Sequence, residues 1–408
     1  MINFSNSNKL RFEDYLFVFF VCLALLGGTN TTYMFVCVAI FLLTLLVFFI
    51  QGRFKNIRDS KLWILFFFLF FAFLVGLING TLLFSTKRVC ELFMFFGAFL
   101  FFDSYRANIY KKRLSKVVYL IVAAWAIISI NAILFYLKYP SAARIIASEQ
   151  DAFGDIYIGG GYRIAYGSCL IAVLVFSLLL NKKITKLWTC AFLLLVFAIL
   201  VMLVILTKST VTFLALLLGL FLALLFENKI LPTVKCVVLF SAFLLVVVFW
   251  RTILETLLNY LAASDEYVFS TRFNSLFNVL LGDSSSGDYA LFRAGIFLES
   301  LNTFAANPLF GVAYLHGNGM VSPTLYGVGN HCEWFDTLAN YGLIGGIPYL
   351  YLYFSNIRSV SPLKNFRISV GWLISLIIMC TFNPFQTFHS FFAFFFLIPS
   401  FYLLIHND

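Results

Sequence analysis

Twelve long apolar runs constrain this chain more than any other feature of its sequence. Each is close to the roughly 20 residues that an α-helix needs to cross the hydrocarbon core of a bilayer. Because lipid offers no partners to backbone N–H and C=O groups, such runs must form helices, whose hydrogen bonds are internal. The pattern predicts an all-α, polytopic membrane helix bundle of about 12 transmembrane helices in a single domain over residues 1–408. The runs cover residues 14–29, 32–50, 62–79, 89–105, 117–137, 164–180, 188–206, 211–226, 237–257, 335–355, 368–383 and 390–405.

The composition excludes an ordinary soluble domain and argues against nucleic-acid binding. Of the 408 residues, 62% are hydrophobic and 11% are charged, whereas soluble domains carry about 25% charged residues. The formal net charge is +10, but the basic residues form short clusters between apolar runs and no stripe interleaved with aromatics. We expect most of the 53 Phe side chains to face lipid or to pack between helices.

The positions of Lys and Arg predict the orientation of the helices. With the N-terminus inside, most of the 28 basic residues fall in inner loops, as the positive-inside rule requires. These are Lys9, Arg11, Arg53, Lys55, Arg58, Lys61, Arg106, Lys111, Lys112, Arg113, Lys116, Lys182, Lys183, Lys186, Lys229, Lys235, Arg358, Lys364 and Arg367. The others lie on or toward the outer side, where they either pair with outer acids or line a cationic surface: Lys87, Arg88, Lys138, Arg144, Arg163, Lys208, Arg251, Arg272 and Arg293.

Two outer segments are longer than a simple connection between helices. The first covers residues 138–163, and the second covers residues 258–334, before the tenth helix. Loops of this length in a compact protein are usually functional or disordered. We therefore expect the extracytoplasmic loop 258–334 to carry part of an active site.

Two common kinds of hydrolytic site find little support. His316 and His331 share a loop with Glu333, and Asp336 follows, but the spacing of a zinc site (HExxH or CxxC) is missing. A serine hydrolase would need a GxSxG elbow after a strand, and none is present. We expect neither a metal nor a cofactor.

The most specific local pattern lies between Arg293 and Phe354. Its parts are Asn307-Pro308-Leu309-Phe310-Gly311, then Gly329-Asn330-His331-Cys332-Glu333-Trp334-Phe335-Asp336, then Tyr341-Gly342-Leu343-Ile344-Gly345-Gly346. A Gly-x-x-Gly pair lets a helix approach its neighbour closely. This pattern resembles the O-antigen ligase and polysaccharide polymerase family of bacterial envelope proteins. In that family an Arg precedes a Pro-x-x-Gly turn, and a His opens a helix carrying Gly-x-x-Gly.

A looser likeness concerns Thr207-Lys208-Ser209-Thr210. The family often carries Thr-x-Ser-Arg at the outer end of an earlier helix, and this chain has Thr210 where Arg is usual. Lys208 could supply the missing cation. Cys332 also departs from the family, where Asn often follows the His.

The resemblance implies a membrane glycosyltransferase of the bacterial inner membrane with its active site on the extracytoplasmic face. Its donor would be a glycan on a polyprenyl (undecaprenyl) diphosphate, and its acceptor a sugar hydroxyl of another lipid-linked repeat unit. Such an enzyme builds O-antigen, capsule or exopolysaccharide in the cell envelope. Membrane lipid would surround it, and chain-length regulator and flippase proteins are the partners that fit this pathway.

The chemistry of this transfer assigns roles to the outer residues. Arginine donates pairs of hydrogen bonds to phosphate oxygens and stays charged, so Arg293, with Arg272, Arg163 and Lys208, would neutralise the diphosphate leaving group. A neutral imidazole accepts a proton near neutral pH, so His331 would activate the hydroxyl, with inversion at the anomeric carbon. Glu333 or Asp336 would orient the imidazole or bind sugar hydroxyls.

Two alternatives remain open. One stays within the family: a ligase that transfers the finished glycan to a lipopolysaccharide core. The other is a transporter of lipid-linked oligosaccharides, which would need ionisable residues at mid-depth in its helices. The nearest candidates, Glu91 and Arg251, lie toward outer ends in the predicted topology.

Overall fold

The chain folds into helices throughout the part that the structure describes. A computed structural model describes residues 9–26, 31–56, 59–79, 82–106, 110–140, 142–147, 161–180, 187–227, 237, 241, 288–312, 328–329, 331–360, 370–383 and 392–405. The elements are α1 (Phe12–Leu26), α2 (Thr31–Ile50), the 3₁₀ helix η1 (Arg53–Asn56), α3 (Asp59–Ile78), α4 (Leu82–Arg106), α5 (Lys111–Lys138), α6 (Ala142–Ala147), α7 (Gly161–Leu180), α8 (Leu187–Leu206), α9 (Thr210–Glu227), α12 (Asp288–Ala306), α13 (Glu333–Val360), α14 (Val370–Phe382), the π-helix η5 (Ala393–Leu397) and α16 (Ile398–Ile405). No strand occurs in these ranges.

The helices follow the apolar runs of the sequence. Every predicted run except 237–257, most of which lies outside the described residues, coincides with a helix, and most ends agree to within a few residues. The larger differences are that α4 begins at Leu82, ahead of the predicted 89–105, that α5 begins at Lys111, ahead of the predicted 117–137, and that α13 extends to Val360, beyond the predicted 335–355. Among the described helices, four are long and apolar enough to cross a membrane: Lys61–Ile78, Lys112–Lys138, Gly161–Leu180 and Leu187–Leu206. The all-α prediction is confirmed for this part of the chain.

Many large apolar side chains point outward from the bundle. Trp188 on α8 is 87% exposed and Trp63 on α3 is 72% exposed. Contact with water would be unfavourable for so much apolar surface, whereas lipid tails accept it. The exposed faces are therefore compatible with a membrane protein.

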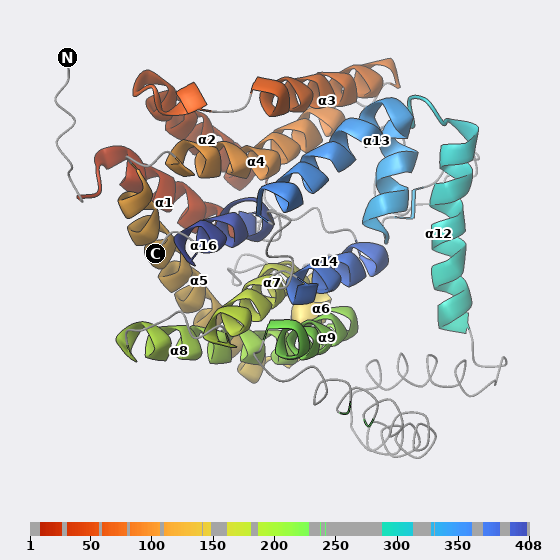
Figure 1. The fold of residues 1–408 in the computed structure, drawn as a ribbon. Coiled ribbons are helices and arrows are strands. Elements are labelled where there is room, and N and C mark those ends of the chain that lie inside the picture. Colours follow the sequence, from red (N-terminus) through yellow and green to blue (C-terminus); the bar gives the residue numbers. More distant parts are fainter. Residues whose placement is uncertain are drawn as a thin grey trace.

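Most helices lie side by side in one bundle, while α12 stands at its edge and runs across the general direction of the others (Figure 1). Close backbone contacts join α9 and α14. A Cβ on Gly371 would lie 2.5 Å from the carbonyl oxygen of Gly219. Ser375 donates a hydrogen bond of 2.7 Å to the carbonyl of Ala215. Small residues permit this approach, as in other apolar helix pairs.

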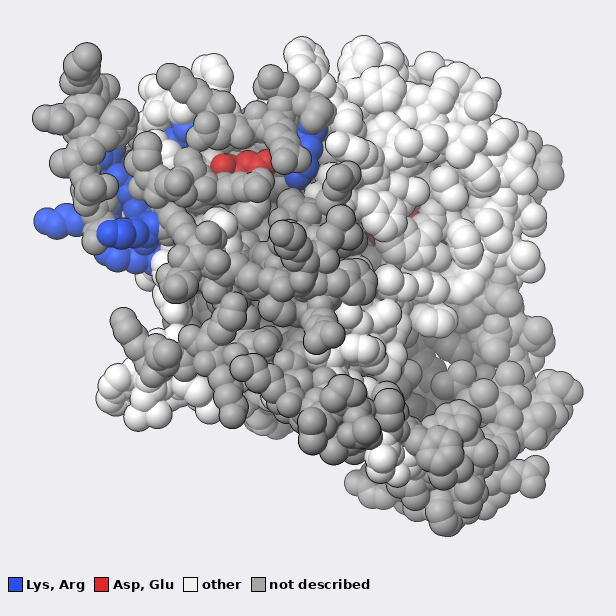
Figure 2. All heavy atoms as spheres, in the orientation of Figure 1, with Lys and Arg blue, Asp and Glu red and all other residues white. Residues whose placement is uncertain are grey.

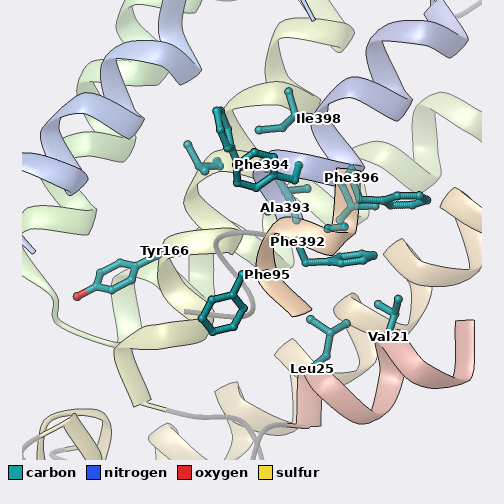
Figure 3. Close-up of a cluster of buried hydrophobic side chains, with 14 of the residues drawn as sticks. Val21, Leu25, Phe95, Tyr166, Phe392, Ala393, Phe394, Phe396 and Ile398 are labelled. Carbon is teal, nitrogen blue, oxygen red and sulfur yellow. The ribbon is translucent and has the colours of Figure 1, made fainter. Parts of the chain in front are cut away.

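The centre of the bundle is an aromatic core around η5. All residues of η5, from Ala393 to Leu397, are buried. Figure 3 shows Phe392 and Phe396 directed toward α1. Their rings lie 6.1 and 4.9 Å from that of Phe17, measured between centroids. The Phe residues thus divide between this core and the exposed faces, as the sequence predicted.

A buried ion-pair cluster joins four segments at one end of the bundle. Arg53 of η1 lies 3.0 Å from Asp14 of α1, and Arg113 of α5 lies 3.4 Å from Glu13. The hydroxyl of Tyr105, near the end of α4, donates a 2.6 Å hydrogen bond to the same oxygen of Asp14. Two acids face two arginines, so the formal charges in this buried site balance.

Aromatic rings enclose Arg53. Its guanidinium carbon lies 4.3 Å from the ring centroids of Phe48 and Tyr105 and 4.4 Å from that of Tyr110. Such cation–π contacts gain strength when the cation is desolvated. Exposed basic side chains surround this end, and Figure 2 shows blue atoms gathered where α1 and α5 begin. They include Lys9, Arg11, Lys112 and Lys116.

We expect Arg53→Ala to lower the free energy of unfolding by about 3–5 kcal/mol, because it leaves Asp14 buried without its closest cation. The measurement is unfolding by SDS in mixed micelles. Lys112→Ala is the control: this exposed residue precedes Arg113, and its loss should change stability by no more than about 0.5 kcal/mol. Equal effects of both substitutions would contradict a stabilising role for the cluster.

Candidate active site

The described residues between Arg293 and Phe354 belong to α12, a turn and a kinked α13. Residues 258–334 were expected to form a loop, but Asp288–Ala306 within them is helical. The run 335–355 was expected to be a helix, and it is helical, but Gly342 has φ 58° and ψ −160°, so α13 consists of two parts joined at a kink. Glycine is nearly the only residue that adopts such a conformation. The two parts run in different directions (Figure 1).

The Asn307–Gly311 turn binds the kink of α13. The N–H of Leu343 donates to the carbonyl of Pro308 at 2.8 Å, and that of Ile344 donates to the carbonyl of Leu309 at 3.1 Å. The first N–H groups of a helix have no partner within it. The turn therefore supplies acceptors for the start of the second part of α13.

Two glycines allow the backbones to meet. A Cβ on Gly342 would lie 2.4 Å from the carbonyl carbon and oxygen of Leu309, and a Cβ on Gly311 would lie 2.4 Å from those of Asn340. Gly311 also has a positive φ of 69°. The Pro-x-x-Gly and Gly-x-x-Gly elements of the sequence are thus two sides of one backbone contact.

The first part of α13 packs against α12 through a polar network. Ser300 donates a hydrogen bond of 2.6 Å to Oδ1 of Asp336, and the N–H of Cys332 donates to Oδ2 at 2.9 Å. The N–H of Gly329 donates to the Ser300 hydroxyl at 2.9 Å. Asp336, in the first turn of α13, therefore caps the helix and holds the residues before it against α12. We call these residues, Gly329, His331 and Cys332, the His331 segment.

His331 and the helix that carries Arg293 lie close together. His331 is partly buried and directly precedes Cys332. Two residues earlier, Gly329 touches Ile296 of α12: a Cβ on this glycine would lie 2.4 Å from the Ile296 carbonyl oxygen. Arg293 precedes Ile296 by about 4.5 Å along the helix axis, at 1.5 Å per residue. The side chain of Arg293 lies outside the described atoms.

Glu333 takes a different direction from Asp336. Its side chain is 0% exposed. Its Oε1 accepts hydrogen bonds from the hydroxyls of Tyr349 and Tyr353, the second at 3.4 Å. Both tyrosines belong to the second part of α13, so the carboxylate bridges the kink. The two acids that the sequence singled out thus hold two different neighbours.

Arg163 and Lys208 share an end of the bundle. Arg163 is exposed in the first turn of α7, and Lys208 lies between α8 and α9 in the left-handed conformation, with φ 52°. Burial lowers the pKa of Lys208 from its ordinary value. The chain reverses direction between α7 and α8, so both cations lie where α7 begins and α8 ends. Arg272 lies outside the described residues.

That end of the bundle also holds the turn after α12 and the kink of α13. Asn79, just after α3, donates a hydrogen bond of 2.9 Å to the carbonyl of Val312. Tyr136, near the end of α5, donates one of 3.2 Å to the carbonyl of Gly161. Since α3, α4 and α5 alternate in direction, the ends of α3 and α5 lie opposite the ion-pair cluster of Arg53 and Asp14. We call this end of the bundle, with the start of α7 and the Gly342 kink of α13, the kink end.

Ser300, Tyr349 and Tyr353 were not predicted as part of the site. Their spacing was a signal in the sequence, because Ser300 and Thr303 stand three residues apart and the tyrosines four apart, which places each pair on one face of a helix. Burial raises the pKa of the Cys332 thiol, so it remains protonated near neutral pH. Within the described ranges, no group of three or more His, Cys, Asp or Glu residues is close enough to hold a metal ion.

We expect Gly342→Ala to lower the free energy of unfolding by about 1–3 kcal/mol from backbone strain alone, and its Cβ would also collide with the Leu309 carbonyl group. The measurement is again SDS-induced unfolding. The control is Gly295→Ala on α12, where an added Cβ meets no atom within 4 Å. Because alanine favours helix, this change should raise stability by about 0.5–1 kcal/mol. A tolerated Gly342→Ala would contradict the contact between turn and kink.

Comparisons with known proteins do not assign this chain to a family. No protein-family model matches it, and no curated protein matches it. A function must therefore come from the residues that the turn, the kink and Asp336 bring together at the kink end.

Proposed function

We propose that this chain is a bacterial inner-membrane glycosyltransferase that polymerises a surface polysaccharide. It transfers a glycan from a polyprenyl diphosphate carrier to a sugar hydroxyl of another lipid-linked repeat unit, on the extracytoplasmic face. One observation carries the proposal: the Asn307–Gly311 turn binds the Gly342 kink through two backbone hydrogen bonds. The Pro-x-x-Gly and Gly-x-x-Gly elements therefore form one contact at the end of the first part of α13, and His331 lies just before the beginning of that part.

The donor carries a diphosphate that leaves with negative charge. Arg293 is the main candidate to neutralise it, because its helix lies against the His331 segment through Ile296 and Gly329. Guanidinium groups bind phosphate oxygens in pairs and act most strongly on charge that grows in the transition state. Arg163 and Lys208 stand at the same end of the bundle, and Arg272 is assigned to this group from the sequence alone.

His331 is the proposed proton acceptor. As the sugar hydroxyl attacks the anomeric carbon, its proton passes to the imidazole, and the bond to the diphosphate oxygen breaks with inversion. The arginines take the place that a metal ion holds in other phosphate-leaving reactions. Because His331 directly precedes the anchored Cys332, the main chain at this position has a defined place next to α12.

The roles of the two acids follow from their partners. Asp336 positions the His331 segment, because both of its oxygens accept hydrogen bonds that tie α13 to α12 or cap it. Glu333 faces the interior of the bundle and bridges the two parts of α13. We therefore assign both to positioning in preference to sugar binding.

The transporter stays an alternative of another class, since a substrate path through the membrane would need ionisable residues at mid-depth. Glu91 was expected near an outer end, but it is the tenth residue of the 25-residue α4. Glu333 also lies inside the bundle, where Tyr349 and Tyr353 of its own helix bind its carboxylate. A ligase that transfers the glycan to a lipopolysaccharide core uses the same chemistry and is separated from the polymerase by its product.

We expect His331→Ala to abolish chain elongation in cells that lack the native protein, because the attacking hydroxyl loses its proton acceptor. The measurement is the length of the surface glycan. Products with a single repeat unit support a polymerase, whereas full-length chains retained on the carrier lipid support a ligase.

The control is Asn302→Ala, an exposed position on α12, which should leave glycan length unchanged. Immunoblots of the membrane fraction check that both variants are inserted in equal amounts. Full-length surface glycan from a normally inserted His331→Ala protein would remove this residue from the mechanism.

A labelling experiment tests the side of the membrane. We expect a cysteine introduced at Asn302 to react with a membrane-impermeant thiol reagent in intact cells, because α12 belongs to the kink end. A cysteine introduced at Lys112 should react only after permeabilisation, because this residue lies at the opposite end of the bundle, next to the ion-pair cluster of Arg53 and Asp14. We call that end the ion-pair end. The unmodified protein gives the background of its own cysteines. The reverse pattern would place the proposed site on the cytoplasmic face, where the donor's glycan is not presented.

A further inference from the structure

Glu333 is a buried carboxylate that accepts hydrogen bonds from two tyrosines of its own helix. Tyr349 and Tyr353 both direct their hydroxyls at Oε1 of Glu333, from the far side of the Gly342 kink. The two tyrosines are themselves 0% and 1% exposed. Glu333 therefore connects the beginning of α13 with the middle of its second part.

The surroundings of these hydroxyl groups are aromatic. The ring of Tyr349 lies 5.1 Å from that of Phe96 and 5.4 Å from that of Phe68. Trp334 lies 5.9 Å from Tyr353. In such a medium a hydrogen bond to a carboxylate is strong, and a buried carboxylate that loses its donor is costly. The contact is therefore a strong constraint on the two parts of α13.

Three contacts together determine where the His331 segment lies. Leu343 binds the turn at the kink, Asp336 binds Ser300 of α12, and Glu333 binds Tyr349. The first two attach this region to α12 and its turn. Of the three, the contact of Glu333 attaches the start of α13 to the aromatic interior of the bundle, two residues after His331.

We propose that Glu333 and Tyr349 form a clamp that positions His331 for glycan transfer. The inference rests on the proposed function, and it adds two positioning residues to that site. Loss of the clamp lets the first part of α13 move relative to the second, and with it His331. A displaced proton acceptor slows the chemical step more than it weakens substrate binding, because reaction demands close alignment of the reacting atoms.

Tyr353 provides a matched comparison. Its hydroxyl is directed at the same oxygen from one turn further along α13, but at 3.4 Å it is a weak hydrogen bond. Tyr349→Phe and Tyr353→Phe each remove one buried hydroxyl and keep the ring. Glu333→Gln keeps an acceptor oxygen for both tyrosines, so it should retain the clamp in large part.

The test combines a distance with a rate in the full-length protein. Spin labels at Asn302 of α12 and Tyr351 of α13, both exposed, give the distribution of distances between α12 and the second part of α13. Elongation of a polyprenyl-diphosphate-linked repeat unit gives kcat and KM, and the dependence of kcat on pH shows whether the proton acceptor still acts.

We expect Tyr349→Phe to broaden the distance distribution and to lower kcat by about tenfold or more, with little change in KM. Tyr353→Phe should have a much smaller effect, and Glu333→Gln should restore most of the activity lost in Glu333→Ala.

The outcomes separate the clamp from the function. An unchanged distance distribution in both Tyr349→Phe and Glu333→Ala overturns the clamp, whatever the activity. Broadened distances with unchanged kcat and pH profile overturn its role in positioning His331. If the unsubstituted protein does not elongate glycans while Tyr349→Phe still broadens the distances, the proposed function fails and the structural clamp stands.

Discussion

The hydrogen bonds from Leu343 to Pro308 and from Ile344 to Leu309 are the interactions on which the candidate site depends. A helix that is interrupted at Gly342 must begin again, and the N–H groups of its new first turn need acceptors. In apolar surroundings an unsatisfied N–H costs several kcal/mol. The turn at Asn307–Gly311 supplies the carbonyl groups, and glycines on both sides let the two backbones come close enough.

From this contact the arrangement of the kink end follows. The turn holds the end of α12 at the kink, and the first part of α13 then lies beside α12. Ser300 and Asp336 join the two helices along their length. Glu333 connects the same segment to the interior through Tyr349. His331 precedes both acids by a few residues. Its main chain is therefore held on one side by the contact of Asp336 with α12 and on the other by the contact of Glu333 with Tyr349.

The ion-pair end and the kink end differ in how they use charge. At the first, Arg53 and Asp14 neutralise each other inside a cage of aromatic rings. At the second, the buried acids Glu333 and Asp336 accept hydrogen bonds from hydroxyl and backbone groups. The charges of the ion-pair cluster therefore neutralise one another, whereas Glu333, inside the bundle, is satisfied by the hydroxyl groups of Tyr349 and Tyr353.

The amino-acid sequence was sufficient to predict the helical class and the positions of most helices. Apolar runs of bilayer length leave the backbone no other way to satisfy its hydrogen bonds, so these features are local. Tertiary contacts establish that Gly342 interrupts the helix, that Glu333 and Asp336 have separate partners, and that the helix of Arg293 contacts Gly329, two residues before His331. These depend on contacts between residues distant in the chain, such as Ser300 with Asp336, and helical periodicity carries no information about which distant partner a polar side chain will meet.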